Sequence, residues 1–382
     1  MKIAVVTNSR IPSLTANSIQ AMKVCQALAQ SGHELRIFAP RETAPATREE
    51  LARHYGLRLV PRLEWLPSVK QLKRFDFVFH AQRAAEAFEA DLIYTWLPQS
   101  AVVALWRQYP TILEMHADVS GRMGAWWLRR FWKMDGQKRM TVTTRALRKA
   151  LERSAGFGFD DAAVLVAPNG VELERYDNLP DPSAARRKLM LKNRLTIGFT
   201  GHIYPGRGAD LLFELARQMP GVNFLWVGGT PELVSYWQKK LATVGAKNVM
   251  MTGFVDHEQI PLYQASADVL LMPYGRSIEG SSGQDIAEVI NPMKMFEYMA
   301  SGRAIVSADL PVIREVLHDR SAVFCEPGNV GAWKSAIESL LLDEKKQRAL
   351  GMQARRDVQR YTWESRARHI MKGMPGPGAS KA

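Results

Sequence analysis

The sequence has few cysteines, no long apolar run and no leader-like start. Its 382 residues include two cysteines, Cys25 and Cys325, which are too few for a disulfide framework or a metal cage. No stretch reaches the roughly 18 to 20 continuous apolar residues of a membrane-spanning helix. The apolar start is followed at once by Arg10 and Pro12, so it is too short for a signal peptide. These absences argue against a disulfide-rich secreted protein and favour a reducing cytoplasm.

Positive charge is in excess, with a formal net charge of +13 at pH 7. Residues 122–153 hold ten basic side chains against only Asp135 and Glu152. The same segment contains four large aromatic residues, Trp126, Trp127, Phe131 and Trp132. Cations beside aromatic rings suit the boundary between anionic lipid headgroups and acyl chains, so we predict a membrane-surface patch. The alternative is a solvated cationic face with the tryptophans packed inward. No zinc-finger or RNA-recognition signature supports nucleic-acid binding.

Strand-like and helix-like patterns alternate along the whole chain. Ile19, Met22, Cys25 and Leu28 mark one apolar helix face, for which Asn17 or Ser18 is the expected cap and Gly32 the expected end. Further helices are expected over 209–217 and 231–244. Strands are expected over 2–7, 34–39, 91–96, 111–115, 141–144, 164–167, 195–200, 222–227, 248–252, 268–272, 304–307 and 322–325. This alternation predicts an α/β fold with parallel sheets covered by helices.

A polar stretch over 177–194, which contains Pro180 and Pro182, interrupts the alternation. We therefore predict two facing Rossmann-like, doubly wound domains over 1–175 and 176–360. A segment over 361–373 and a glycine- and proline-rich, disordered tail over 374–382 follow them. Two such domains imply a deep cleft, and ligands of these sheets bind beyond the carboxyl ends of the strands.

The loop over 201–208, Gly-His-Ile-Tyr-Pro-Gly-Arg-Gly, follows a predicted strand and precedes a predicted helix. Its glycines permit close backbone approach, and Arg207 can bind a phosphate in bidentate fashion. The helix start adds a dipole that favours an anion. A tight connection without a ligand is the alternative interpretation. The dinucleotide fingerprint Gly-x-Gly-x-x-Gly is absent from this loop.

A second candidate is the helix expected to start near Pro292 and to end at Gly302. Lys294 and Glu297 lie three residues apart on it. Such a pair can be a surface ion pair worth a few tenths of a kcal/mol. Alternatively, Lys294 and the helix start face a diphosphate, and Glu297 accepts hydrogen bonds from a ribose.

Residues 291–310 resemble the nucleotide-sugar motif of retaining glycosyltransferases with the GT-B fold, specifically glycosyltransferase family 4 (glycosyl transferases group 1). Four further segments agree in order and spacing: 167–172, 201–208, 227–229 and 362–364. The resemblance covers nearly the whole chain. It implies an N-terminal acceptor domain, a C-terminal nucleotide-sugar donor domain, and a C-terminal helix over 361–373 that crosses back to the N-terminal domain.

The resemblance also implies roles for individual residues. Arg207 takes the place of a basic residue that binds the donor diphosphate. The family often has an arginine at the position of His202, and Lys294, at the helix start, could supply this second cation instead. His116, which follows a predicted strand, lies beside the donor sugar, and Asp118 orients it or contacts the acceptor. The residues assigned to the reacting centre are His116, Arg207 and Lys294. Those assigned to donor binding are Gly201, His202, Gly206, Asn291, Met293 and Glu297.

The chain departs from the family pattern at two places. The family spaces two glutamates as Glu-x7-Glu, and Glu297 matches the second, but Val289 stands at the first. Glu288, Glu279, Asp285 and the backbone amides over 280–283 stay open as replacements. The loop over 8–18 has no glycine where the family is glycine-rich, although Asn17 and Ser18 could still offer hydrogen bonds.

The implied reaction transfers a hexose from a UDP- or GDP-hexose, with retention at the anomeric carbon. The nucleotide sugar is the donor substrate, and no cofactor is bound. No metal is expected, and no Asp-x-Asp motif is present. The basic patch suggests a lipid-linked, envelope polysaccharide or glycolipid acceptor. We expect a cytoplasmic protein, peripheral at the inner face of the membrane. The alternatives are a nucleotide-sugar 2-epimerase of the same fold and a non-catalytic scaffold that binds nucleotide sugars.

Overall fold

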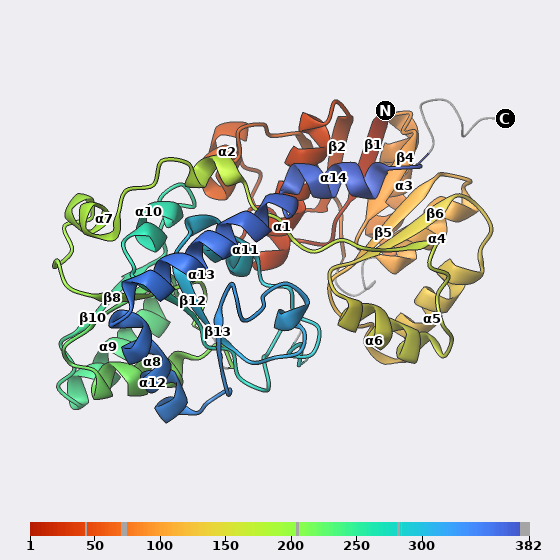
Figure 1. Cartoon of the computed structure of the whole chain (residues 1–382). Helices are drawn as coiled ribbons and strands as arrows, with labels where there is room; N and C mark the ends of the chain where they lie inside the picture. Colours follow the sequence, from red (N-terminus) through yellow and green to blue (C-terminus); the bar gives the residue numbers. More distant parts are fainter. Residues whose placement is uncertain (43, 70–74, 204–205, 281–282, 284, 375–382) are drawn as a thin grey trace. The chain divides into compact units, whose positions relative to one another are not determined.

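The computed structural model describes residues 1–382 except 43, 70–74, 204–205, 281–282, 284 and 375–382. The chain forms two compact units (Figure 1). Unit 1 comprises Met1–Asn169 and the segment that begins at Trp363, and unit 2 comprises Gly170–Thr362. Of the tail over 374–382, only Met374 lies within the described residues.

Unit 1 is built on a seven-stranded sheet of order β3-β2-β1-β4-β5-β6-β7, with every neighbouring pair parallel. Its strands are β1 (Lys2–Val6), β2 (Glu34–Pro40), β3 (Arg62–Leu66), β4 (Leu92–Thr95), β5 (Thr111–Met115), β6 (Lys138–Val142) and β7 (Val164–Val166). The central strands are continuously buried because helices cover both faces of a parallel sheet. Chain order reverses between β1 and β4, which is the switch point where ligands of such sheets bind.

Seven helices belong to the described part of unit 1. They are α1 (Ala16–Gln30), α2 (Arg48–Tyr55), α3 (Phe75–Ala87), α4 (Pro98–Trp106), α5 (Gly121–Lys133), α6 (Arg145–Ala155) and α14 (Trp363–Met371). One core cluster joins β1, β2 and β4 to α3 and α4, with Phe38 and Phe77 fully buried. Helix α14, the last of the chain, packs against α1, the first. The first and the last helix therefore pack against one another in unit 1.

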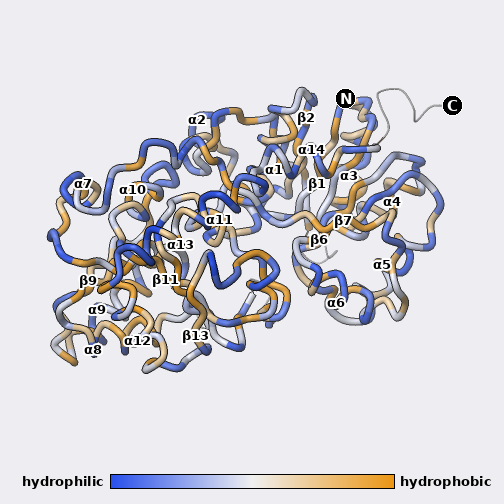
Figure 2. The backbone as a smooth tube through the Cα atoms, in the orientation of Figure 1, coloured by the Kyte–Doolittle hydropathy of each residue, from blue (hydrophilic) through white to orange (hydrophobic). Residues whose placement is uncertain are grey.

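Unit 2 contains a six-stranded parallel sheet of order β10-β9-β8-β11-β12-β13. Its strands are β8 (Thr196–Thr200), β9 (Asn223–Val227), β10 (Val249–Gly253), β11 (Val269–Met272), β12 (Ala304–Ala308) and β13 (Val323–Cys325). Its helices are η2 (Leu173–Tyr176), α7 (Pro182–Lys188), α8 (Ala209–Gln218), α9 (Pro231–Thr243), α10 (Ile260–Ala265), α11 (Met293–Ser301), η3 (Ile313–Glu315), α12 (Val330–Leu341), α13 (Glu344–Asp357) and η4 (Val358–Arg360). Hydrophobic colour concentrates in strands such as β9 and β11 (Figure 2). Order reverses between β8 and β11, so the loops after these strands share one switch point.

The predicted α/β class with two Rossmann-like sheets is confirmed, and most expected strands agree with the structure to within a residue or two. The expected strand over 141–144 is displaced, because β6 begins at Lys138 and Thr144 instead caps α6 by accepting from the Leu147 N–H. Strand β3 was not predicted. The expected caps of the first helix are wrong, since the N-cap residue is Thr15 and Asn17 is exposed within the first turn.

Candidate active site

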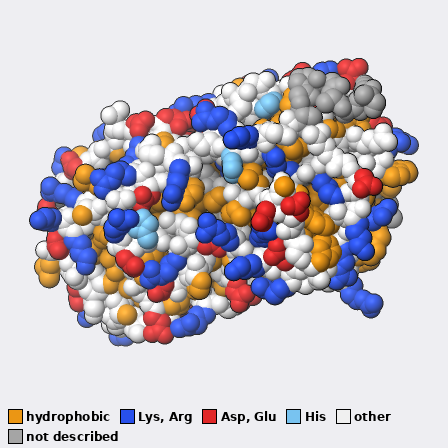
Figure 3. Space-filling model, turned by 45° about the vertical axis from the view of Figure 1, so that its right-hand side comes forward, with side chains coloured by type: hydrophobic (Ala, Val, Ile, Leu, Met, Phe, Trp, Pro, Cys, Tyr) orange, Lys and Arg blue, Asp and Glu red, His pale blue; other side chains and the backbone are white. Residues whose placement is uncertain are grey.

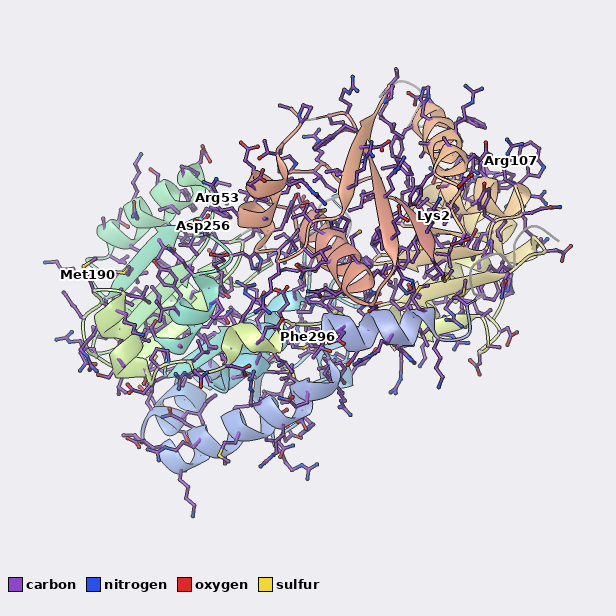
Figure 4. The ribbon with its side chains drawn as sticks, turned by 90° about the horizontal axis from the view of Figure 1, so that it is seen from above. Lys2, Arg53, Arg107, Met190, Asp256 and Phe296 are labelled. Carbon is purple, nitrogen blue, oxygen red and sulfur yellow. The ribbon has the colours of Figure 1, made fainter. Side chains whose placement is uncertain are left out.

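Six residues of unit 2 gather where β8 and β11 end. This Lys294 cluster consists of Phe199, Gly201, Arg207, Tyr274, Lys294 and Glu297. Gly201 directly follows β8, and Tyr274 follows β11 by two residues. Helix α11 brings Lys294 and Glu297 from a distant part of the sequence. Phe296, labelled in Figure 4, is fully buried on the same helix. Its ring centre lies 5.2 Å from that of Tyr361.

Lys294 is half-buried along its side chain, but its Nζ is buried rather than part of a surface ion pair. Its Nζ lies 3.9 Å from the centre of the Phe199 ring and 5.6 Å from that of Tyr274. The same nitrogen has no hydrogen-bond partner among the described residues. Burial lowers the pKa of the Lys294 ammonium well below its usual value, and the Arg207 charge lowers it further, while Glu297 opposes both effects. The amine is therefore a buried donor held mainly by aromatic faces.

Gly201 leaves room for this amine, and Gly206 leaves room for the loop that follows β11. A Cβ on Gly201 would lie 2.8 Å from Lys294 Nζ, and the residue has φ +122°. A Cβ on Gly206 would lie 2.1 Å from the Ser277 carbonyl oxygen, where the loop after β11 packs. The two glycines are thus required by space as well as by backbone conformation. Residues 204–205 of the same loop lie outside the described part of the chain.

Arg207 is the second cation of the cluster. Its side chain is half-buried, and its Nε has no hydrogen-bond partner among the described residues. It lies close enough to Lys294 to disfavour the charged amine, and close enough to Tyr274 to act on its hydroxyl. Burial raises the pKa of Tyr274 to about 12, and Arg207 opposes that rise. Two like charges with unused donors form an arrangement that an anion would complete.

Glu297 is oriented by Gln264, which the sequence did not single out. The Gln264 Nε2 donates to Glu297 Oε2 at 3.2 Å and to Thr200 Oγ1 at 3.3 Å. Gln264 is fully buried on α10. Tyr298, the next residue on α11, accepts from the Thr200 backbone N–H at 2.8 Å. These contacts tie α11 to the end of β8.

The remaining predicted donor residues surround this cluster. Asn291 and Met293 are half-buried at the start of α11, whose N-cap residue, Pro292, makes no side-chain cap hydrogen bond. His202 is half-buried and follows Gly201. The structure thus brings His202, Gly206, Asn291 and Met293 to the loops and helix start that carry Lys294.

Val289 stands buried at the position of the family's first glutamate, 7% exposed. Asp285, one of the open replacements, accepts from the Ile278 and Ala287 backbone N–H groups, so it organises its own loop. Glu288 and Glu279 are exposed. Residues 281, 282 and 284 lie outside the described residues, so the candidate amides there stay predictions.

His116 of unit 1 lies in a second cluster, made of Gln20, Tyr94, Glu114, His116 and Arg366 (the His116 cluster). His116 follows β5, and its Nε2 lies 2.5 Å from Glu114 Oε1. Glu114 is buried in β5 and Arg366 in α14, at 2.7 Å from one another. Asp118 was expected to orient His116 or to contact the acceptor. Its carboxylate accepts from Ser154 Oγ and the Val119 N–H, so the orienting role is not seen and the acceptor contact stays a prediction. Glu114 has the orienting role.

The aromatic basic segment forms α5 and part of α6. Trp127 lies 5.9 Å from Phe75, Trp132 lies 4.5 Å from Phe159, and Phe131 is buried, so these three pack inward. Trp126 is 48% exposed on α5. The exposed residues of α5 belong to the predicted membrane-surface patch and are named the lipid-type face after that prediction: Arg122, Met123, Trp126, Arg129, Arg130 and Lys133. Lys and Arg side chains also spread over the visible surface in Figure 3, with acidic side chains between them.

Among the described residues, no helix is both long and apolar enough to span a bilayer. In the same part of the chain, no group of three or more His, Cys, Asp or Glu side chains is placed to hold a metal ion. Both cysteines are buried and free.

Comparison with known proteins agrees with this architecture. The profile described as Glycosyltransferase Family 4 matches residues 18–175, and the profile described as Glycosyl transferases group 1 matches residues 194–343. The chain belongs to this glycosyltransferase family. The two profiles fall on the two units in the expected order, so this glycosyltransferase carries both halves of the family pattern.

Three relatives illustrate the range of similarity. The GDP-mannose-dependent alpha-(1-6)-phosphatidylinositol monomannoside mannosyltransferase of Mycolicibacterium smegmatis is 24% identical over 363 residues, 90% of this chain and 91% of its own. TuaH of Bacillus subtilis is 29% identical over 175 residues, so the match spans 45% of this chain and 40% of TuaH. A crystal structure of HepE from Anabaena in complex with UDP has a TM-score of 0.74 at 18% identity, covering 97% of this chain and 98% of HepE. The last likeness shows the shared GT-B fold.

Proposed function

We propose that this glycosyltransferase is a retaining hexosyltransferase that moves a hexose from a UDP- or GDP-hexose to a lipid-linked, envelope polysaccharide or glycolipid acceptor. The observation that carries the proposal is the Lys294 cluster. Lys294 and Arg207 are two neighbouring cations with buried, unused donors, at the switch point of a Rossmann-like sheet. A diphosphate supplies both the negative charge and the acceptor oxygens that this arrangement requires.

The start of α11 strengthens the case for a diphosphate. Helix N-termini favour anions because their first backbone N–H groups and the helix dipole point outward. Pro292 contributes no side-chain cap there. Glu297, one turn further along α11 and held by Gln264, is the acceptor for a ribose hydroxyl. Diphosphate and ribose together describe the leaving group of a nucleotide sugar.

In this proposal the chemistry is stabilisation of a leaving group. As the bond to the anomeric carbon breaks, charge develops on the diphosphate, where Arg207, Lys294 and the α11 dipole counter it. The acceptor attacks on the face that the leaving group vacates, which gives retention. Unit 2 holds the donor, and unit 1 contributes His116 and the acceptor side. No paired carboxylates of the glycoside-hydrolase kind are required for this route.

The relatives support a nucleotide-sugar donor without fixing its base. The mannosyltransferase from M. smegmatis is named for GDP-mannose, and the HepE crystal structure holds UDP. The same mannosyltransferase is named for a phosphatidylinositol acceptor, which fits the lipid-type face of α5. We therefore propose UDP or GDP as the nucleotide and a lipid-linked acceptor.

The first experiment measures thermal stabilisation of the protein by UDP, GDP, ADP, CMP and their sugars. A ligand at 100 times its dissociation constant adds about 2.7 kcal/mol to the free energy of unfolding. We expect one nucleoside diphosphate to shift the melting temperature selectively, and Glu297→Ala to abolish the shift. Glu338→Ala removes a comparable helical glutamate on α12, a helix that carries no proposed site residue, where Glu338 pairs with Lys334, and is the control.

Two outcomes would favour the rival functions. If no nucleotide stabilises the folded protein, a scaffold without donor binding replaces the transferase, and Val289 is its first suspect. If incubation with a UDP-hexose and no acceptor yields an epimerised sugar and free UDP, the chain is a 2-epimerase. Transfer to an added lipid acceptor with the α-linkage of the donor retained would support the proposed reaction.

The membrane part is tested by cosedimentation with vesicles that contain anionic lipid. Arg122→Glu, Arg130→Glu and Lys133→Glu together reverse the exposed cations of α5. Lys345→Glu, Lys346→Glu and Arg348→Glu make the same charge change on exposed positions of α13 in unit 2. We expect only the α5 variant to leave the pellet, since each cation near an anionic leaflet contributes about 1 kcal/mol. Equal loss in both variants, or wild-type protein in the supernatant, would contradict a specific patch.

A further inference from the structure

Glu114 is a buried charged side chain of unit 1 with four side-chain contacts. It is fully buried in β5, and four side chains donate to its carboxylate. Gln20 Nε2 and Arg366 Nη2 approach Oε1 at 2.6 and 2.7 Å, and His116 Nε2 lies 2.5 Å from the same atom. The Tyr94 hydroxyl donates to Oε2. Nothing in the reaction as proposed above uses this carboxylate directly.

The contacts of Glu114 favour an ionised carboxylate. Burial by itself would raise the pKa of Glu114, but the Arg366 charge, the charge and hydrogen bond of His116, and the hydrogen bond from Tyr94 hold the pKa well below its usual value. An ionised carboxylate can only accept hydrogen bonds. His116 Nε2 must therefore carry a hydrogen and donate it. In the neutral ring, Nδ1 is then left as the acceptor nitrogen.

Arg366 anchors this arrangement from the far end of the chain. Its Nε donates to the Ala167 and Pro168 carbonyl oxygens, at 3.2 and 3.0 Å. Its guanidinium is 4% exposed and faces Glu114. The Arg366 group thus fixes the Glu114 carboxylate, and the carboxylate in turn fixes the His116 ring. A residue that binds one imidazole nitrogen in this way determines which of the two nitrogens is free for chemistry.

We propose that Arg366 and Glu114 are positioning residues that lock the His116 ring in the Nε2–H tautomer, with Nδ1 available to a substrate hydroxyl. The inference deepens the proposed function, since it rests on His116 acting on the substrate. Arg366 and Glu114 do not touch the substrate in this scheme. They act only by holding the ring and its acceptor nitrogen.

The test uses the full chain with ¹⁵N-labelled histidine, and a His116→Asn variant assigns the ring signals. Long-range ¹H–¹⁵N spectra distinguish the Nε2–H tautomer, the Nδ1–H tautomer and the doubly protonated ring. We expect wild type and Arg366→Lys to show His116 as Nε2–H. Arg366→Met is expected to lose that single form. Arg368→Met, on the same helix but in an exposed pair with Glu364, is the control and should leave the spectrum unchanged.

Activity gives the second readout. With the preferred nucleotide sugar, Arg366→Met should lower kcat by about tenfold or more. The KM for the donor should change less than about twofold, because the substitution leaves the Lys294 cluster untouched. Arg366→Lys should recover part of kcat. The double variant Arg366→Met with Glu114→Gln removes the isolated buried charge, so it should fold even where Arg366→Met does not. It should show the same mixed His116 signals as the single variant.

The outcomes separate this inference from the proposed function. An Nδ1–H ring in the wild type would overturn the positioning role. So would His116 signals in Arg366→Met and in the double variant that are the same as those of the wild type. A fall in kcat with unchanged His116 signals would also overturn it, because Arg366 would then be structural only. A wild type that binds no nucleotide yet shows the Nε2–H ring would defeat the proposed function and leave the positioning of His116 intact.

Discussion

Glu114 in unit 1 and Lys294 in unit 2 are both charged side chains buried beside an arginine, but the signs around them differ. Glu114 faces an opposite charge, Arg366, and receives hydrogen bonds from four side chains. Lys294 lies near a like charge, Arg207, as well as the opposite charge of Glu297, and its Nζ has no hydrogen-bond partner among the described residues. Buried charges in folded proteins are ordinarily paired. The first cluster thus satisfies its buried charge by hydrogen bonds within the chain, and for the second we propose that an anion from outside supplies them.

The largest expected effect concerns the complete cluster. Arg366→Met leaves Glu114 buried without its counter-charge and should lower the free energy of unfolding by about 3–5 kcal/mol. Urea denaturation at pH 7 measures the loss, and adding Glu114→Gln should restore most of it. Glu114 has a lowered pKa in the folded state, so its contribution is present above the usual carboxyl range and disappears as the pH falls through that lowered pKa. If Arg366→Met lowers the free energy of unfolding by less than about 1 kcal/mol, the proposed difference between the two clusters is wrong.

The incomplete cluster should respond in the opposite way. Lys294→Met removes a buried ammonium that has no anion, so the free protein should be within about 1 kcal/mol of wild type or more stable. Its affinity for the preferred nucleoside diphosphate should fall by about 10- to 150-fold, the equivalent of about 1.5–3 kcal/mol for a charged hydrogen bond. Titration calorimetry and melting curves measure the two quantities on the same samples. Strong destabilisation with intact binding would assign Lys294 a structural role.

A third effect follows from the pKa of Lys294. The pKa of the amine is lowered in the free protein, and an anion raises it, so the complex holds more protons than the free protein. Affinity should therefore fall as the pH rises between these two pKa values, by at most about tenfold per pH unit. Calorimetry in two buffers with different heats of ionisation should give different binding enthalpies. The Lys294→Arg variant stays charged at all these pH values, so its response to pH and buffer measures the protons exchanged by the diphosphate itself. If the wild type and Lys294→Arg respond equally, Lys294 does not take up a proton.

The smallest effect separates the sugar side of the nucleotide from its phosphates. Gln264→Met removes the donor that orients Glu297. It should weaken binding of the nucleoside diphosphate by about 0.5–1.5 kcal/mol, the contribution of one hydrogen bond. Inorganic pyrophosphate, which has no ribose, should bind equally well to the variant and to wild type. A parallel loss for both ligands would mean that Gln264 supports the whole cluster rather than Glu297.

The sequence predicted most of the sheet because buried parallel strands are largely continuous apolar runs, such as Val269–Met272 in β11. It did not predict β3, since Arg62 and Glu64 give that edge strand no apolar run and its residues are half-buried or exposed. It displaced β6 because Lys138 and Arg139 begin the strand with charged residues. Edge and strand-end residues meet solvent, so composition alone does not mark them.

The candidate site shows the same division. Gly201, Arg207, Lys294 and Glu297 were singled out from the sequence because they lie on short motifs with a helix or strand signal beside them. Gln264 and Arg366 had no such signal, since their partners are 33 and 252 residues away. Asp118 was named as a residue that orients His116 or contacts the acceptor, whereas Glu114, which lies within the strand and contacts the ring, was given no role. These roles depend on pairs of side chains that are far apart in the chain, and a single sequence carries no pattern that reveals such pairs.

The attachment of α14 to β5 also sets the order in which the chain can be assembled. During synthesis, the strands of unit 1 leave the ribosome first, but Arg366 emerges only after all of unit 2, which is one continuous segment. Until then Glu114 lacks its counter-charge, and α1 lacks the helix that covers it. Domains generally fold as units while the chain is being made. The half that is translated first is therefore completed last, and unit 2 is the half able to mature on the nascent chain.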